Sequence, residues 1–245
     1  MRYLILDDIR GIALLSMMVY HLVWDLVYIG GLNLEWYQSK GAFIWQQSIC
    51  WTFIILSGFC WNLGRNKLKR GAIVFGCGAV IMLVTALFVP ENQVIFGILT
   101  LLGSCTLICI PLEKLLLKIP PQLGILLSAL LFICFRMINE GYLGWGEHII
   151  YDLSDKWYEG YLMTYLGFTD SHFFSTDYFS LLPWCFLFLL GYYLYHLLER
   201  RNKLNILSMK GIRCIEYIGK HSLIIYLCHQ PVLYAVTVAC FKQLS

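Results

Sequence analysis

Four polar side chains in the first long apolar segment have the types and spacing that proton transfer needs. Arg10 and His21 are eleven residues apart, so in an α-helix they return to within about 20° of one face, about 16 Å apart along the axis. Asp7 precedes Arg10 by three residues and Asp25 follows His21 by four, which adds both carboxylates to the same stripe. We predict His21 as a general base, with Asp25 either fixing its tautomer, which we favour, or binding a substrate.

A second histidine of this kind lies in the last apolar segment. His221 begins that segment, and His229 follows eight residues later, about 12 Å deeper along a helix. Pro231 leaves the backbone carbonyl one turn earlier without its N–H partner. His229 is therefore either a second catalytic group or a structural residue bonded to that carbonyl, and it ranks below His21 because it has no aligned arginine. Gln230 is a candidate substrate contact beside it.

The elements that position these residues are long apolar helices. Of the 245 residues, 59% are hydrophobic and 13% are charged, against about 25% charged in a soluble domain. The apolar blocks of roughly 17–22 residues match a hydrocarbon core of about 30 Å. We predict one all-α, polytopic transmembrane helix bundle over residues 1–245, embedded in a lipid bilayer. The seven expected spans are 9–30, 42–62, 71–89, 94–111, 121–138, 179–198 and 221–241.

The charges of the connections predict an orientation. With these spans, fourteen of the 18 Lys and Arg residues lie on one side and four on the other, so the N-terminus is expected in the cytoplasm and the C-terminus outside. Asp7 and Asp8 stand where a signal peptide is basic, so the first segment is expected to remain in the mature protein. We expect a multi-pass protein of the plasma membrane.

A position within the membrane restricts where the first polar stripe can face. Each charge near the bilayer centre costs at least a few kcal/mol, so Asp7, Arg10, His21 and Asp25 should face the bundle interior or a water-filled cavity. The alternative for His21 is a hydrogen bond between helices without any chemistry. Arg10 taken alone is also typical of an interfacial anchor.

The one long connection, 139–178, is expected outside the cell and is both acidic and aromatic. It holds seven carboxylates against the single base Lys156, and Trp and Tyr favour the headgroup level. We predict short amphipathic helices lying on the outer interface; a plain aromatic belt is the alternative. Asp177, just before the sixth span, is a candidate acceptor contact or an N-cap before the helix.

Several segments resemble a known group of enzymes. Asp7–Ala13 followed by His21 resembles the arginine–histidine motif of transmembrane acyltransferases, and 56–59 and 219–231 are similar to their LSGF and last-helix elements. Gly58 in the LSGF element also suits a close helix contact. A closer resemblance is to bacterial relatives of the heparan-α-glucosaminide N-acetyltransferase catalytic-domain family. It rests on these segments: His21–Asp25, Phe96–Leu99, Asp177–Phe179 and Pro183–Trp184. Thr100 departs from the pattern, because the family often has a histidine there.

The resemblance implies acyl transfer across the membrane. Cytosolic acetyl-coenzyme A would be the donor, and the acceptor would be a hydroxyl or amine of an extracytoplasmic glycan or glycolipid. His21 would then be the base or would itself carry the acyl group, while Asp177, Trp184 and Gln230 would contact the acceptor. Because the larger acyltransferases have more helices, a homodimer is expected.

Basic residues are candidates for the phosphates of the donor. Arg10 lies at the mouth of the stripe and is the better candidate. The connection after the second span contains four more: Arg65, Lys67, Lys69 and Arg70. Topology alone also explains these four, because cytoplasmic loops are rich in Lys and Arg. The ten cysteines and six histidines form no metal-binding pattern, so we expect no metal. We also expect no nucleic-acid partner.

Two other classes of function compete with the enzyme. A small proton-coupled transporter also uses intramembrane His, Asp and Arg, although carriers usually show repeated halves and no repeat is evident here. A non-catalytic membrane subunit would use the stripe for assembly. Binding of coenzyme A separates the enzyme from both alternatives.

Overall fold

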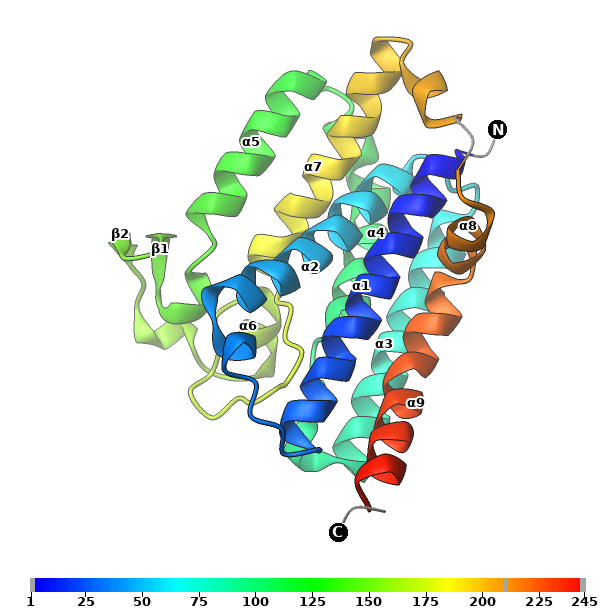
Figure 1. The fold of residues 1–245 in the computed structure, drawn as a ribbon. Coiled ribbons are helices and arrows are strands. Elements are labelled where there is room, and N and C mark those ends of the chain that lie inside the picture. Colours follow the sequence, from blue (N-terminus) through cyan, green and yellow to red (C-terminus); the bar gives the residue numbers. More distant parts are fainter. Residues whose placement is uncertain (1–2, 209–210, 243–245) are drawn as a thin grey trace. The chain divides into compact units, whose positions relative to one another are not determined.

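A computed structural model describes residues 3–208 and 211–242. Within these ranges, seven helices are long and apolar enough to cross a membrane, which confirms the predicted polytopic helix bundle (Figure 1). Contacts between Cα atoms divide the chain into two compact units, each described here by itself. Unit 1 comprises Met1–Leu56 and Asn202–Ser245, and unit 2 comprises Ser57–Arg201.

Unit 1 is built around the first helix. The helix α1 packs along both α8 and α9, as Figure 1 shows. Leu14 and Met17 of α1 form a small core with Ile49 of α2. The elements of unit 1 are α1 (Leu4–Tyr28), η1 (Glu35–Gln38), most of α2 (Lys40–Trp61), η5 (Leu204–Ser208), α8 (Arg213–Lys220) and α9 (Ser222–Lys242).

The short helix α8 was not predicted from the sequence, and glycines hold it tightly against α1. A Cβ on Gly219 would lie 1.9 Å from the carbonyl oxygen of Asp7, and one on Gly11 would lie 2.3 Å from that of Ile215. Only residues without a side chain allow backbones to approach this closely. The polar connection before the last span is thus a helix packed against the start of the polar stripe.

Unit 2 contains two packed helix pairs, α3 with α4 and α5 with α7 (Figure 1). Gly103 of α4 lies so close to α3 that a Cβ there would meet the Phe75 nitrogen at 2.5 Å. The helices of unit 2 are the end of α2, α3 (Lys67–Phe88), η2 (Pro90–Asn92), α4 (Ile98–Leu116), α5 (Pro121–Cys134), η3 (Ile138–Glu140), η4 (Asp155–Trp157), α6 (Tyr161–Leu166) and α7 (Leu181–Arg200).

The predicted span boundaries agree with the helices to within five residues. The largest differences are at α1, which begins at Leu4 rather than at residue 9, and at α4, which ends at Leu116 rather than at residue 111. The span predicted at 121–138 is not one continuous α-helix. There the α-helix ends at Cys134, and a turn followed by η3 completes a 20-residue candidate span from Pro121 to Glu140.

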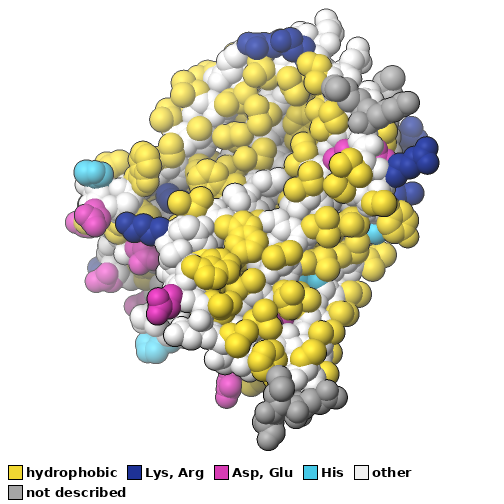
Figure 2. Space-filling model, in the orientation of Figure 1, with side chains coloured by type: hydrophobic (Ala, Val, Ile, Leu, Met, Phe, Trp, Pro, Cys, Tyr) yellow, Lys and Arg dark blue, Asp and Glu magenta, His cyan; other side chains and the backbone are white. Residues whose placement is uncertain are grey.

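The long connection contains a β-hairpin that was not predicted, together with short helices of the kind that the sequence predicted. Strands β1 (Tyr142–Trp145) and β2 (His148–Asp152) pair antiparallel, with Trp145 opposite His148. Gly146 at the turn has φ of 54°, a conformation that glycine adopts without strain. Only α6 is an α-helix among the described residues of this connection. Figure 2 shows acidic side chains gathered near the hairpin and hydrophobic ones along the helices.

Candidate functional site

In unit 1, two histidines from distant parts of the chain meet between α1 and α9. The ring centroids of His21 and His229 are 4.9 Å apart, with the planes at 61°. Sequence reasoning treated these residues as rivals, since nothing in their spacing could show that α1 and α9 pack together. The structure makes them one pair.

The backbone of α9 sets the tautomer of His229. Its Nδ1 lies within hydrogen-bonding distance of the Tyr226 carbonyl oxygen, one turn earlier in the helix. Because a carbonyl can only accept, Nδ1 carries the proton and Nε2 keeps a lone pair in the neutral ring. His229 therefore bonds to the carbonyl of Tyr226 and not to that of Leu227, which is the one that Pro231 deprives of its N–H partner. Nε2 is buried without a hydrogen-bond partner among the described residues.

Asp25 joins α1 to α9 one turn beyond His21. Its side chain is fully buried, and its Oδ1 accepts a hydrogen bond of 2.8 Å from Gln230 Nε2. The other oxygens of this pair, Asp25 Oδ2 and Gln230 Oε1, are buried and unpaired within the part of the chain that the structure describes. Asp25 thus contacts Gln230, and the orienting role predicted for it at His21 stays a prediction.

Together these groups form a polar cluster with unused hydrogen-bonding capacity. Leaving a buried polar atom unpaired costs about 1–3 kcal/mol, and native structures have few such atoms. Here three of them, His229 Nε2, Asp25 Oδ2 and Gln230 Oε1, come from the same two helices. This arrangement suits a site that receives polar groups from water or from a substrate.

The other half of the predicted stripe lies at the α8 end of α1. Arg10 donates to Asp7 Oδ1 at 3.1 Å, and the Asp7 backbone is the one that packs against Gly219. Both side chains are largely buried, with 20% and 11% exposure. Arg10 is therefore an ion-paired residue on the stripe, and its contact with donor phosphates stays a prediction.

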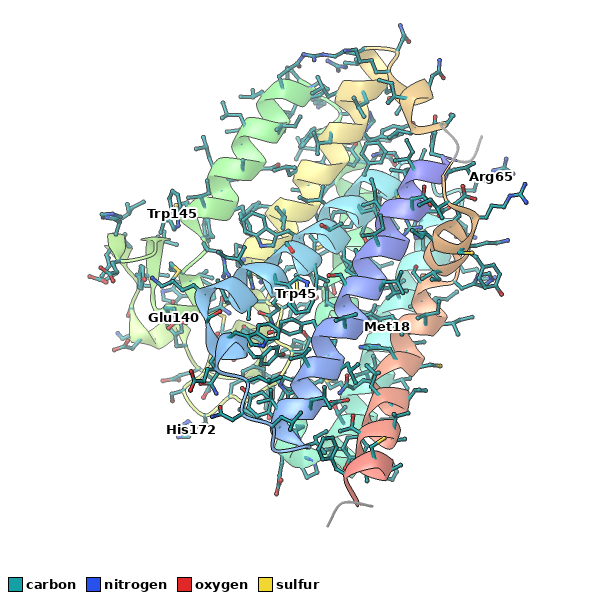
Figure 3. The ribbon with its side chains drawn as sticks, viewed as in Figure 1. Met18, Trp45, Arg65, Glu140, Trp145 and His172 are labelled. Atoms are coloured by element: carbon teal, nitrogen blue, oxygen red, sulfur yellow. The ribbon has the colours of Figure 1, made fainter. Side chains whose placement is uncertain are left out.

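Sequence reasoning missed an aromatic wall in unit 1 beside His21. Tyr20 packs on Tyr37 at 5.1 Å and on Trp45 at 5.2 Å between ring centroids. Trp45 (Figure 3) donates its indole N–H to Ser16 Oγ at 2.7 Å. Tyr37 belongs to η1, and burial raises the pKa of its phenol, with Tyr20 adding to the effect. The consecutive aromatic residues at 36–37 were the sequence feature that could have indicated this cluster.

In unit 2, the predicted basic cluster is partly used in structural contacts. Lys67 Nζ lies 2.8 Å from Glu113 Oε1 and 3.5 Å from the centroid of the Trp61 ring. Arg70 donates to the Cys60 carbonyl at 3.2 Å. Binding of donor phosphates by this cluster stays a prediction. Three members are exposed: Arg65, which projects outward in Figure 3, Lys69 and Arg70.

Asp177 does accept a hydrogen bond at the start of a helix, but the helix is α4 and not its own α7. Its carboxylate accepts from the Ile98 N–H at the start of α4, and Oδ2 would lie 3.2 Å from a Cβ on Gly97. Burial raises its pKa to about 6, and the hydrogen bond from Ile98 opposes this. Phe179 N–H also donates to the Phe96 carbonyl at 2.9 Å. The two sequence motifs 96–99 and 177–179 thus form one structural element.

Trp184 is buried within unit 2. It packs on Phe179 at 5.0 Å and on Phe132 at 5.6 Å between ring centroids, and the Arg136 guanidinium lies 5.0 Å from its ring. Its predicted contact with the acceptor stays a prediction. Across residues 3–208 and 211–242, no group of three or more His, Cys, Asp or Glu side chains is arranged to hold a metal ion.

Comparison with protein-family models gives a match over most of the chain. The family described as heparan-alpha-glucosaminide N-acetyltransferase, catalytic, matches residues 2–231. This range includes both histidines of the α1–α9 pair together with Asp25 and Gln230. No curated protein and no solved structure matches the chain.

Proposed function

Because the chain belongs to the heparan-alpha-glucosaminide N-acetyltransferase catalytic family, we propose that it is a transmembrane acyltransferase that uses acetyl-coenzyme A. The acceptor is a hydroxyl or amine of an extracytoplasmic glycan or glycolipid. The observation that carries the proposal is the pairing of His21 with His229, whose Nε2 is buried and unpaired among the described residues. A base with an available lone pair inside a lipid-embedded bundle has a clear use in acyl transfer.

The proposed orientation follows the charges of the connections. The side that carries most of the Lys and Arg residues faces the cytoplasm, where acetyl-coenzyme A is found. The 139–178 connection lies on the other side, where the acceptor arrives. His21 lies eleven residues beyond Arg10, about 16 Å deeper along α1, so the two substrates reach it from opposite faces of the plasma membrane.

In the proposed reaction, His21 takes the proton from the acceptor hydroxyl or amine while the acceptor attacks the thioester carbonyl. A new C–O or C–N bond forms, the C–S bond breaks, and His21 returns the proton to the departing sulfur. His229, with its Nδ1–H held by Tyr226, lies against the His21 ring with its Nε2 lone pair unused by the described residues, so it accepts from the acceptor hydroxyl or amine and positions it for His21.

A two-step route uses the same pair. His21 attacks the thioester carbonyl with one ring nitrogen, the C–S bond breaks, and coenzyme A leaves as the thiol with the proton of the other ring nitrogen. The acceptor then attacks the acyl-histidine, the acyl–nitrogen bond breaks, and His21 takes the acceptor's proton. The routes differ in one observable, which is a covalent label on His21 before the acceptor is added.

The first experiment measures binding and consumption of radiolabelled acetyl-coenzyme A by the purified protein, together with His21→Ala and His229→Ala. His172→Ala is the matched control, because its side chain is 95% exposed on the long connection (Figure 3). We expect His21→Ala to abolish turnover while binding persists, and His229→Ala to lower turnover by about 10²–10³-fold, as loss of a positioning group does.

The outcomes separate the alternatives. Loss of turnover only in His229→Ala exchanges the roles of the two histidines. Label that stays on the wild type after denaturation, and is absent from His21→Ala, supports the two-step route. A wild type that neither binds nor consumes acetyl-coenzyme A contradicts the proposal and favours a proton-coupled carrier.

A further inference from the structure

Unit 2 holds a second buried polar pair that the proposed reaction does not use. The ring centroids of Tyr192 and His196, one turn apart on α7, are 4.7 Å from each other. Tyr192 is completely buried. The Tyr192 hydroxyl and His196 Nε2 both lack a hydrogen-bond partner within residues 3–208 and 211–242. Unpaired buried polar atoms are costly, so two in contacting side chains indicate a place for a polar group that comes from elsewhere.

A carboxylate determines what this pair can bind. His196 Nδ1 lies 3.1 Å from Glu199 Oε2. Because a carboxylate only accepts, Nδ1 carries the proton, and Nε2 of the neutral ring is an acceptor. The Tyr192 hydroxyl supplies a donor. The N–H and C=O of a trans secondary amide point in opposite directions, so a donor beside an acceptor complements a chain with two amides, one of which gives its C=O and the other its N–H.

The surroundings favour a ligand that also carries negative charge. The centroids of the Trp61 and Tyr192 rings are 5.5 Å apart, and Lys67 Nζ lies over the Trp61 ring at 3.5 Å from its centroid. The connection between Trp61 and Lys67 contains the exposed Arg65, and Lys69 follows with its side chain exposed. Asn62 Nδ2 in this connection is also buried without a partner among the described residues.

We propose that Tyr192 and His196 bind the amide-containing pantetheine arm of the acyl-coenzyme A donor. This inference rests on the proposed function and concerns unit 2 by itself. The Tyr192 hydroxyl donates to an amide carbonyl of the arm, and His196 Nε2 accepts from an amide N–H. Arg65 and Lys69 meet the phosphates. The donor chemistry accounts for both the amide-binding pair and the exposed bases beside it.

Tyr192→Phe tests this proposal, and the neighbouring residue gives a matched control. Tyr193 is also buried, but its hydroxyl already donates to the Leu116 carbonyl at 3.3 Å. Tyr192→Phe removes a hydroxyl that has no protein partner in the described structure, so the variant should fold. Tyr193→Phe removes one that does, so it should weaken the fold without touching the donor.

The measurement is the Kd of acetyl-coenzyme A and of S-acetylpantetheine, which lacks the nucleotide phosphates, in detergent. We expect Tyr192→Phe to weaken both ligands by the same factor, about tenfold for one lost hydrogen bond in a buried site. Tyr193→Phe should leave both Kd values unchanged. A variant with Arg65→Gln and Lys69→Gln should weaken acetyl-coenzyme A alone, because the smaller ligand has no phosphate to lose.

The failures of the two proposals differ. If the wild type does not bind acetyl-coenzyme A, the proposed function fails and this inference fails with it. If the wild type binds but Tyr192→Phe and Tyr193→Phe have equal affinity, the function stands and the binding site is wrong; the unpaired atoms then hold water. Unequal loss of the two ligands in Tyr192→Phe also contradicts contact with the shared arm.

Discussion

Replacing Asp177 with Asn should stabilise the protein at neutral pH. The Asp177 carboxyl is buried against the start of α4, and burial raises its pKa from the ordinary 3.8 to about 6. Ionising this buried carboxyl lowers the free energy of unfolding. The free energy of unfolding is therefore highest below the ordinary pKa of 3.8 and falls as the pH rises through about 6. Asn removes the charge and keeps an oxygen that accepts from the Ile98 N–H.

The size of the effect follows from the pKa difference. The pKa is about two pH units above the ordinary value, and each unit is worth about 1.4 kcal/mol, so the buried charge costs about 3 kcal/mol at neutral pH. For a chain of this size, about 3 kcal/mol corresponds to roughly 6–12 °C in the midpoint of thermal unfolding. This is an upper limit, because the amide N–H groups of Asn need partners that the carboxylate does not.

Thermal unfolding in detergent at several pH values measures the effect. A thiol-reactive dye reports unfolding, because Cys105 and Cys109 are buried in the fold and become reactive when it opens. We expect the wild type to lose stability between acidic and neutral pH. Asp177→Asn should lack that loss, and the two curves should meet at a pH below the ordinary pKa of 3.8.

Asp170 is the matched control, because its pKa shifts the other way. The backbone N–H groups of Gly160 and His172 donate to its carboxylate, each at 2.9 Å, and lower its pKa. Its stabilising contribution is present above the ordinary pKa and is lost as the pH falls. Asp170→Asn should therefore destabilise at neutral pH. Equal and pH-independent effects of Asp177→Asn and Asp170→Asn would refute the reasoning.

Two further variants test the packing of the helices and the polar site. Gly58→Ala would place a Cβ 1.9 Å from the Phe188 carbonyl oxygen, so it should lower the free energy of unfolding by about 1–3 kcal/mol. Gly76→Ala meets nothing within 4 Å, so it should raise the free energy of unfolding by up to about 1 kcal/mol. Equal unfolding midpoints for the two variants would contradict this. Gln230→Leu leaves Asp25 Oδ1 buried and unpaired, so it should cost about 1–3 kcal/mol. Adding Asp25→Leu should restore part of that loss, and additive losses in the double variant would show that the two side chains do not depend on each other.

The sequence predicted the spans because hydrophobic length is a local property. A run of apolar residues must hide its backbone polar groups in lipid, and only a helix does so within one segment. Boundaries shifted by up to five residues, since helix ends depend on capping and on neighbouring backbone rather than on hydropathy. α8 was missed for the same reason. It has too few residues to span, and it is held by the close contact of Gly219 with Asp7.

The long connection shows the opposite case. Its composition predicts an interfacial segment, which stays a prediction, and composition does not distinguish a hairpin from short helices. The pairing of β1 with β2 depends on the turn at Gly146, whose positive φ is a backbone choice. Asp177 was likewise recognised as a helix-capping type of residue, but the helix that it caps begins about eighty residues earlier in the chain.

The sequence alone determined the membrane-embedded helical class, the family resemblance and the individual polar residues of the stripe, because each of these depends on local composition or on helical periodicity. Only the tertiary structure decided which of those residues meet. The pairing of His21 with His229 and of Asp25 with Gln230 depends on how helices pack and rotate. Periodicity along one helix shows which residues share a face, but the face that a neighbouring helix presents to it is decided by the packing of both.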